Sequence, residues 1–406
     1  MSAVRWMRRL FFGGCGLVLF TILGPVSSSW AASVSGQLLS NEPLSVFTQQ
    51  QLAEQFQTNG IPFEPKTGVK VFRFSYATET PGLNPRIVEA SGIIIVPNSP
   101  LAKIPWISLQ HGTILSDAQT PSVQAGEGLL EGSLGFLTVV PDYLGYGKSS
   151  DLFHPYFIEQ AYERTGVDAL RAARTFAAQQ GLDLGSLYLK GYSEGGFATL
   201  ALQKALETTY AGEFDLRASA PSAGPYNLEG TALQLFSKSK INPVYSTFIL
   251  LAFDHWLANP PLDLDAIFAV EPSILEGLFD GSTAYGAVLD TLPSETSLLL
   301  EPGFLDEFLK AVPADLQTSK IRRWLQEQDL LDKNWVPSTP TRLYHCQDDE
   351  IVPVEATVLT YAAFKNAQPA APIASVIIPS VAGQKPYQHG TCPAIFSPVQ
   401  WFLQLN

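Results

Sequence analysis

The sequence is poor in cysteine, in positive charge and in charged residues overall, and each shortage excludes a class of protein. Three cysteines in 406 residues are too few for a disulfide-dense scaffold, and neither a CxxC pair nor a His-rich run suggests a zinc site. Only 25 Lys and Arg stand against 38 Asp and Glu, a formal charge of -13 that disfavours nucleic acid and anionic membranes as partners. Charged residues make up 16% of the chain and hydrophobic ones 46%, so a large globular core is expected.

Residues 1–31 have the pattern of a secretory signal peptide. Three arginines among the first nine residues precede an apolar run from Leu10 to Leu23, and small residues follow up to Ala31. That run is shorter than the roughly 20 residues that a membrane span needs, although a transmembrane anchor is the alternative. Cleavage after Ala31 would leave 22 basic and 38 acidic residues, a charge of -16. We therefore predict a secreted or periplasmic protein.

Beyond the leader, strand and helix patterns alternate. β-rich runs predict strands at 69–76, 87–96, 104–110, 136–140, 187–189, 217–220, 341–346 and 374–378. Helical spacing predicts helices near 167–176, 194–208, 354–364 and 398–405, and the second is apolar nearly all round, as buried helices are. Strands followed by crossover helices indicate an α/β fold with a mostly parallel sheet and helices on both faces.

One long stretch interrupts this alternation. Residues 226–336 have a sequence pattern typical of helices, which predicts an inserted helical cap. The predicted organisation is a core made of residues 32–225 and 337–406, with the cap between the two parts.

A serine between two glycines is the first candidate for chemistry. The string Gly191–Gly195 directly follows the predicted strand 187–189 and opens the buried helix. G-x-S-x-G is a weak pattern alone, but this context is that of a nucleophile on a tight strand-to-helix turn. The turn strains the serine backbone, and a side chain two residues before or after it would clash. We predict Ser193 as the nucleophile. A glycine-rich turn with a solvent-exposed serine is the alternative.

A histidine late in the chain is the candidate general base. His389 lies between the last predicted strand and the last helix, where its neutral ring can take the proton of Ser193 Oγ and return it to the leaving group. The other histidines are less suitable by position: His111 comes too early, His154 lies in a Pro- and aromatic-rich loop, His255 lies in the cap, and His345 lies in a strand, where a structural role is expected.

Three consecutive acids follow the predicted strand 341–346. Any of Asp348, Asp349 and Glu350 is placed to accept the second N–H of His389 and to stabilise the imidazolium. At least one of the three must be a solvated loop carboxylate, so position alone leaves the choice open.

Backbone N–H groups of Thr113 and Glu194 are candidates for holding an oxyanion. The string 110–113, Gln-His-Gly-Thr, follows the strand 104–110, and Glu194 opens the buried helix, whose N-terminus carries partial positive charge. N–H groups from both places would hold a developing negative oxygen about 3 Å away. An ordinary glycine turn is the alternative for the first string, in which His111 would orient the loop.

These strings, in the order oxyanion loop, serine, acid and histidine, resemble the α/β-hydrolase superfamily over nearly all of residues 68–406. In that family the acid often stands in a D-x-x-V-P string, which residues 349–353 match, and this favours Asp349 over Asp348. The string 141–147 resembles the loop after the family's fourth strand, where the aspartate is usually structural, so Asp142 is left out of the triad. Together with the Gly-Tyr-Ser-x-Gly-Gly turn at residues 191–196, these strings are similar to the secreted lipase and esterase branch with a large helical cap.

The resemblance implies acyl transfer from a carboxylic ester, as in a lipase or carboxylesterase. Ser193 would attack the carbonyl with His389 as base and Asp349 orienting the ring, and the N–H groups of Thr113 and Glu194 would hold the oxyanion. Water would then release the acid, with no metal or organic cofactor. A serine peptidase of the same fold is an alternative, since Glu194 or acids of the cap leave open a site for a free amino terminus. A non-catalytic binding protein of this fold is a third possibility.

If this triad is correct, the two cysteines of the mature chain are neighbours. Cys346 lies three residues before Asp349, and Cys392 lies three residues after His389. A disulfide would clamp the loops of the acid and the base, and closing a loop of about 46 residues is worth roughly 4 kcal/mol in the chain-entropy model. Two free buried thiols are the alternative.

The cap would decide which substrate is accepted. Its apolar run 245–257 is suited to line an acyl pocket, but a helix packed on the core explains the same residues. The expected partner is a small-molecule or lipid ester, uncharged or apolar, with transient contact between the cap and a lipid interface. Nucleic acid is not expected as a partner.

Overall fold

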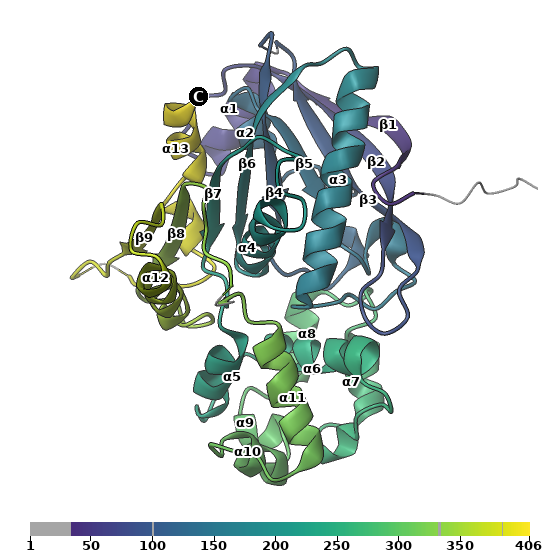
Figure 1. Cartoon of the computed structure of the whole chain (residues 1–406), viewed down its shortest axis with the longest axis vertical. Helices are drawn as coiled ribbons and strands as arrows, with labels where there is room; N and C mark the ends of the chain where they lie inside the picture. The colour runs from purple at the N-terminus through teal and green to yellow at the C-terminus, as the bar shows by residue number, and fades with distance from the viewer. Residues whose placement is uncertain (1–33, 100, 332–333, 384) are drawn as a thin grey trace, which may run out of the picture. The chain divides into compact units, whose positions relative to one another are not determined.

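The computed structural model describes residues 34–99, 101–331, 334–383 and 385–406, and the predicted signal peptide lies outside this part of the chain. The described residues form a nine-stranded sheet in the order β1-β2-β3-β5-β4-β6-β7-β8-β9 (Figure 1). The strands are β1 Leu38–Phe47, β2 Val69–Glu79, β3 Ile87–Pro97, β4 Ile104–Gln110, β5 Leu137–Pro141, β6 Leu184–Tyr192, β7 Leu216–Ser222, β8 Thr341–Cys346 and β9 Ile373–Ile378.

The sheet is antiparallel at one edge and parallel through the rest. Strands β1, β2, β3 and β5 pair antiparallel, whereas β5, β4, β6, β7, β8 and β9 pair parallel. The carboxyl ends of the parallel strands share one edge of the sheet, so the loops that follow β4, β6 and β8 meet there. The predicted fold class, a mostly parallel α/β sheet with helices on both faces, is confirmed.

Helices cover the sheet on both faces. On one face α3 Glu159–Gln179 and α4 Glu194–Glu207 bury their apolar sides against residues such as Leu187 and Leu189. The opposite face is covered by α1 Gln49–Thr58, α2 Leu129–Ser133 and α13 Pro398–Leu405, which pack around Tyr188. Successive residues of β6 therefore point to opposite layers, as the two-residue repeat of a strand requires. Beside β8 and β9, α12 Glu355–Ala367 buries Phe364 against the sheet.

The predicted strands and helices of the core are present, with ends shifted by a few residues, but β1, α1 and the short helix α2 were missed. Strand β1 carries Asn41, Glu42 and Pro43 in its middle, and these side chains are exposed. It is an edge strand paired only with β2, and edge strands accept proline and charge that a central strand would reject. Its sequence therefore lacks the apolar alternation by which the other strands were predicted.

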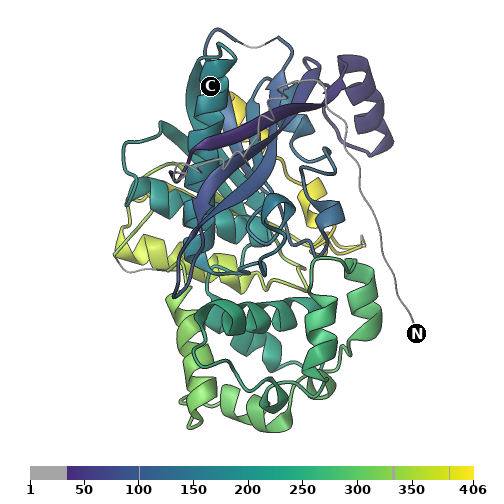
Figure 2. The same cartoon turned by 90° about the vertical axis from the view of Figure 1, so that its right-hand side faces the viewer.

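Between β7 and β8 the described residues form helices and two isolated β-bridges. The helices lie together in green in both views (Figures 1 and 2). They are α5 Leu228–Phe236, α6 Pro243–Leu257, α7 Pro272–Leu278, α8 Tyr285–Thr291, α9 Thr296–Leu299, α10 Pro302–Phe308 and α11 Leu316–Glu327. All lie within the interval 226–336 that the sequence analysis assigned to the cap, and the domain boundaries themselves stay a prediction. Among the described residues, no helix is long and apolar enough to cross a membrane.

Candidate active site

Ser193 sits on a sharp turn between β6 and α4. Its backbone has φ 60° and ψ -121°, the left-handed side of the map, which is costly for a residue with a side chain. The glycines on either side make the turn possible, because a Cβ on Gly191 would lie 2.2 Å from the carbonyl oxygen of Gly195. A Cβ on Gly195 would lie 2.1 Å from the carbonyl oxygen of Gln110. The sequence thus provides the space that this strained turn requires.

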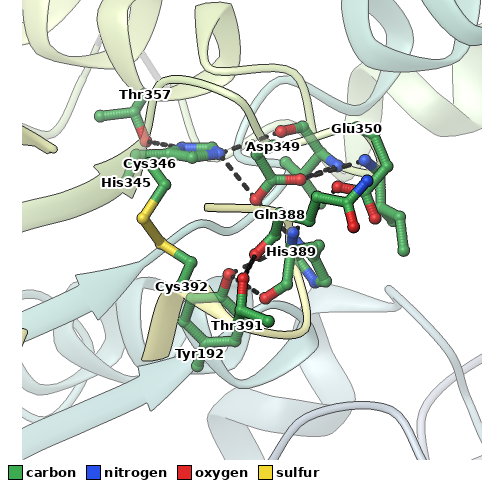
Figure 3. The surroundings of a disulfide bond; sticks show 12 residues. Tyr192, His345, Cys346, Asp349, Glu350, Thr357, Gln388, His389, Thr391 and Cys392 are labelled. Carbon is green, nitrogen blue, oxygen red and sulfur yellow. Dashed lines mark hydrogen bonds and ion pairs between the residues drawn. A yellow bond between two sulfur atoms is a disulfide. The ribbon is translucent and has the colours of Figure 1, made fainter. Parts of the chain in front are cut away.

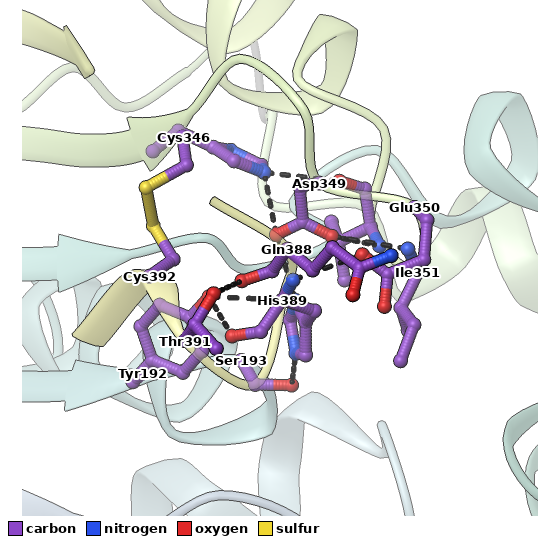
Figure 4. A network of polar contacts seen from close by, with 12 residues as sticks. Tyr192, Ser193, Cys346, Asp349, Glu350, Ile351, Gln388, His389, Thr391 and Cys392 are labelled. Carbon is purple, nitrogen blue, oxygen red and sulfur yellow. Dashed lines mark hydrogen bonds and ion pairs between the residues drawn. A yellow bond between two sulfur atoms is a disulfide. The ribbon is translucent and has the colours of Figure 1, made fainter. Parts of the chain in front are cut away.

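Ser193, His389 and Asp349 are brought together from three loops. Nε2 of His389 lies 2.8 Å from Oγ of Ser193, and Nδ1 of the same ring lies 2.7 Å from Oδ2 of Asp349 (Figure 4). Both distances are those of hydrogen bonds, and the three side chains are buried or nearly so. This geometry allows the histidine to take a proton from the serine hydroxyl while the carboxylate fixes the ring orientation.

The three consecutive acids have different partners. Asp349 accepts hydrogen bonds at Oδ1 from the backbone N–H groups of Ile351 and Val352, which leaves Oδ2 for the ring of His389. The carboxylate of Asp348 instead accepts a hydrogen bond from Oγ of Ser380 at 2.6 Å. Of the two aspartates left open by position, the structure therefore places Asp349 against the histidine.

Glu350, the third acid, holds the histidine by its backbone. Its Oε2 accepts the backbone N–H of His389 at 3.0 Å, and the hydroxyl of Tyr192 donates to the carbonyl oxygen of His389 at 2.8 Å. Hydrogen bonds therefore fix both the backbone N–H and the backbone carbonyl of His389. Sequence reasoning missed these roles, although both residues lie next to predicted site residues.

The electrostatics of Asp349 favour its charged form. Burial raises the pKa of this carboxyl, but hydrogen bonds from His345 and His389 and attraction to both rings outweigh the burial, so its pKa lies well below the ordinary value. An ionised carboxylate at this position stabilises positive charge on His389 when the ring accepts a proton.

A disulfide joins the loops that carry the acid and the histidine. Cys346 ends β8 and Cys392 follows His389 by three residues, and their sulfur atoms are bonded (Figure 3). The predicted disulfide is thus confirmed. It links the chain just before Asp349 to the chain just after His389, so it limits how far the two loops can separate.

The loop 110–113 lies beside Ser193. A Cβ on Gly112 would be 4.0 Å from the Cβ of Ser193, and the hydroxyls of Thr113 and Tyr156 are 2.9 Å apart. The backbone N–H of Glu194 is the first of helix α4 and has no acceptor within the helix. These positions are compatible with an oxyanion site, whose donors stay a prediction.

His111 and Asp142 take structural positions behind this loop. The ring of His111 stacks on Tyr143, with Nδ1 2.7 Å from the carbonyl oxygen of Gly112 and Nε2 3.2 Å from that of Asp142. The carboxylate of Asp142 accepts hydrogen bonds from the hydroxyl of Ser91 and the backbone N–H of Ser122. Neither side chain contacts Ser193 through any hydrogen bond of the described residues.

The side chain of Glu194 is buried, and one of its carboxylate oxygens contacts two residues. Its Oε1 lies 3.0 Å from Nε2 of His154 and accepts a hydrogen bond from the hydroxyl of Tyr162 at 3.0 Å. The other ring nitrogen of His154 lies 2.7 Å from the carbonyl oxygen of Leu144. The sequence analysis missed this buried pair because forty residues separate its members.

An apolar cavity opens beside Ser193. Its wall is formed by the cap, by the loop that follows β8 and by the core segment before α3, including Tyr156, Phe236, Tyr245, Ile249, Leu325 and Val352. The run 245–257 in α6 was interpreted either as the lining of an acyl pocket or as a helix packed on the core. Each interpretation holds for some of its residues. Ile249 faces this cavity, whereas Phe248 stacks on Tyr156 of the core and Phe253 is fully buried.

The comparisons with known proteins agree with this geometry. Residues 112–254 match the family described as secretory lipase. The esterase LipA of Xanthomonas oryzae, described as degrading the rice cell wall, is 27% identical over 92% of this chain and 96% of its own, with a TM-score of 0.77. No curated protein sequence matches the chain.

More distant structures share the fold alone. A putative hydrolase of Legionella pneumophila is 23% identical, with 91% of this chain and 98% of its own covered and a TM-score of 0.78. Lipase A of Candida antarctica in its closed state is 18% identical, with 92% and 82% covered and a TM-score of 0.61. The chain has the α/β-hydrolase fold and is similar to the secreted lipase and esterase branch of that superfamily.

Proposed function

We propose that this chain is a secreted serine hydrolase that cleaves carboxylic esters. The observation that carries the proposal is the continuous relay of 2.8 Å and 2.7 Å contacts from Ser193 through His389 to Asp349, at the base of an apolar cavity. The match to secretory lipases and the similarity to an esterase support ester hydrolysis and export. The signal peptide 1–31 and its cleavage belong to the proposal.

In the proposed reaction, Ser193 Oγ attacks the ester carbonyl while its proton passes to Nε2 of His389. The oxyanion is held by the backbone N–H groups of Thr113 and Glu194, and the protonated ring donates to the departing alcohol. The acyl group is then on Ser193. Water, deprotonated by His389, attacks this acyl-enzyme, releases the carboxylic acid and restores the serine.

The walls of the cavity favour an uncharged or apolar acyl group. Phe236, Ile249 and Leu325 present hydrocarbon to the space beside Ser193. A charged acyl group there would lose its hydration without gaining a partner among these side chains. A lipid or small-molecule ester is therefore the proposed substrate, and transient contact between the cap and a lipid interface is proposed with it.

Peptidase activity of an aminopeptidase type is less well supported. Such an enzyme needs a free carboxylate to bind the amino terminus of its substrate. Glu194, the acid adjacent to the nucleophile, is buried and already bonded to His154 and Tyr162, so it is not available to an amino group.

The test compares wild type with Ser193→Ala on a series of p-nitrophenyl esters and on aminoacyl anilides. We expect wild type to hydrolyse the esters faster than the anilides and the variant to lose about four orders of magnitude or more in kcat. A fluorophosphonate probe should label wild type and leave the variant unlabelled. Equal ester turnover by the two proteins would refute the proposal, and faster turnover of anilides would favour the peptidase alternative.

A further inference from the structure

A second histidine contacts the carboxylate of Asp349. His345 lies on β8, four residues before Asp349, and its Nε2 is 3.2 Å from Oδ2, the oxygen that also faces His389 (Figure 3). Its ring is completely buried. The sequence analysis expected only a structural histidine at this position, because the strand pattern does not show that the chain returns toward the ring after β8.

The contacts of His345 determine which ring nitrogen carries the proton. Nε2 faces two acceptors, Oδ2 of Asp349 and the carbonyl oxygen of Val352 at 3.0 Å, and neither of them can donate. Nε2 must therefore carry a hydrogen. Nδ1 lies 2.8 Å from the hydroxyl of Thr357, which can donate to it. A ring with its proton on Nε2 makes its hydrogen bond to the carbonyl oxygen of Val352, and the same N–H lies within 3.2 Å of Oδ2 of Asp349, so the ring presents a shared donor to the carboxylate.

This donor completes the set of contacts around Asp349. The backbone N–H groups of Ile351 and Val352 hold Oδ1, and the rings of His389 and His345 share Oδ2. With donors on both oxygens, rotation of the carboxylate would break at least one hydrogen bond. His345 is in turn fixed by the sheet through β8 and by α12 through Thr357.

We propose that His345 is a positioning residue of this hydrolase, which holds Asp349 toward His389 and limits the negative charge that Asp349 offers to the His389 ring. The inference rests on the proposed function, since it assigns a role within the same relay. A donor that shares Oδ2 competes with His389 for it. Removing that donor should let Asp349 attract the His389 proton more strongly and should loosen the orientation of the carboxylate.

Other ionisable groups lie beside this relay and are the same in wild type and in the variants of the test. Glu350 accepts the backbone N–H of His389, and the hydroxyl of Tyr192 lies 3.5 Å from Nδ1 of that ring. The charge of Asp349 contributes to raising the pKa values of Tyr192 and Tyr245, for both of which burial is the main cause. Both tyrosines are therefore neutral over the pH range of the test, and Glu350 is a further carboxyl group beside the histidine among the described residues.

The test measures kcat, KM and the pH profile of kcat/KM on a soluble ester for His345→Leu and His345→Gln. In the leucine variant we expect kcat to fall about tenfold with KM nearly unchanged, because the loss is one of alignment. The acid limb of the profile should move to higher pH by about half a unit, because His389 is easier to protonate. Glutamine can place an amide N–H near the former Nε2. The kcat and the acid limb of His345→Gln should therefore lie closer to those of wild type than to those of His345→Leu.

Matched variants separate positioning from stability. Thr357→Val removes the partner of Nδ1 and should move the acid limb in the same direction by less, whereas Thr360→Val, one turn later in α12, should leave it in place. Phe364→Leu loosens the same helix without contacting the relay, and it should lower the melting temperature with no shift of the profile.

The outcomes distinguish this inference from the proposed function. A wild-type enzyme that hydrolyses no ester and takes no fluorophosphonate label refutes the proposed function. If wild type is active, an acid limb that is unchanged or shifted to lower pH in His345→Leu overturns the inference alone. Failure of glutamine to restore the profile overturns it as well. If His345→Leu does not fold, the comparison of Thr357→Val with Thr360→Val decides. An acid limb that does not move to higher pH in Thr357→Val relative to Thr360→Val then overturns the inference.

Discussion

The two sides of the proposed active site are built by different physical means. On the core side, the loops after β8 and β9 are joined by the Cys346–Cys392 disulfide and by the hydrogen bond from the backbone N–H of His389 to Glu350, and Tyr192 at the end of β6 donates to the carbonyl oxygen of His389. On the cap side, helices α5, α6 and α11 face Ser193 mainly with apolar side chains such as Leu228, Ile249 and Leu325.

This difference separates chemistry from substrate choice. Hydrogen bonds are directional and lose their value within a few tenths of an ångström, so the core side holds the reacting atoms at fixed distances. Apolar contacts are non-directional and depend on area and volume, so the cap side can change its side chains and keep its packing. We expect substitutions on the core side to change the rate for every ester and those on the cap side to change which ester is preferred.

The largest effect should come from the acid of the relay. Asp349→Asn keeps the shape of the side chain but removes the negative charge and lets the amide favour the wrong tautomer of His389, so kcat should fall by about four orders of magnitude. Asp348→Asn is the matched control, because its carboxylate bonds Ser380 instead, and its kcat should stay within about twofold. Steady-state kinetics on one short ester measures both. A severe loss of kcat in Asp348→Asn would show that Asp348, and not Asp349, is the acid that supports His389.

A smaller effect is expected from removing the covalent link on the core side. Replacing Cys346 and Cys392 together by serine should lower the free energy of unfolding by about 4 kcal/mol, because the unfolded chain is no longer cross-linked over 46 residues. Activity of the folded protein should fall much less, since Tyr192 and Glu350 still hold His389. Denaturant unfolding and initial rates on the same sample measure the two quantities. An activity loss as large as that of Asp349→Asn would show that hydrogen bonds alone do not fix the core side.

The same contrast explains what could be predicted from the sequence. Strands β2 to β8 and helix α4 are recognisable because each buries a run or a face of apolar side chains, whereas β9, of which only Ile373 is buried, follows from its β-branched residues. The proposed nucleophile, base and acid follow from their order along the chain and from glycine and D-x-x-V-P spacing, because a strained turn and a loop of fixed path allow few alternatives. These features are local in the sequence, so a single stretch of residues carries the signal.

Features that join distant segments left no such signal. The pair of His154 and Glu194 and the contact between His345 and Asp349 depend on where loops return in space. The sequence predicted that the cap is helical but not where its helices begin and end. Helices α7 to α10 have only four to seven residues each, and no side chain caps their first turn. Which face of α6 meets the cavity is set by the packing of its neighbours, and α6 is apolar nearly all round.

The smallest overall effect, and the sharpest test of the cap side, should come from Ile249→Trp. The larger ring would occupy part of the cavity beside Ser193, so longer acyl chains should lose room while the shortest ester still fits. We expect kcat/KM for a long acyl ester to fall about tenfold relative to a short one, with kcat on the short ester changed less than about threefold. Ile274→Trp is the control, because Ile274 lies on α7, is 46% exposed and does not line this cavity. The measurement is kcat/KM against acyl chain length for both variants. A uniform loss over all chain lengths in Ile249→Trp would show that α6 also orients the relay, and the separation between a core side that sets rate and a cap side that sets preference would then fail.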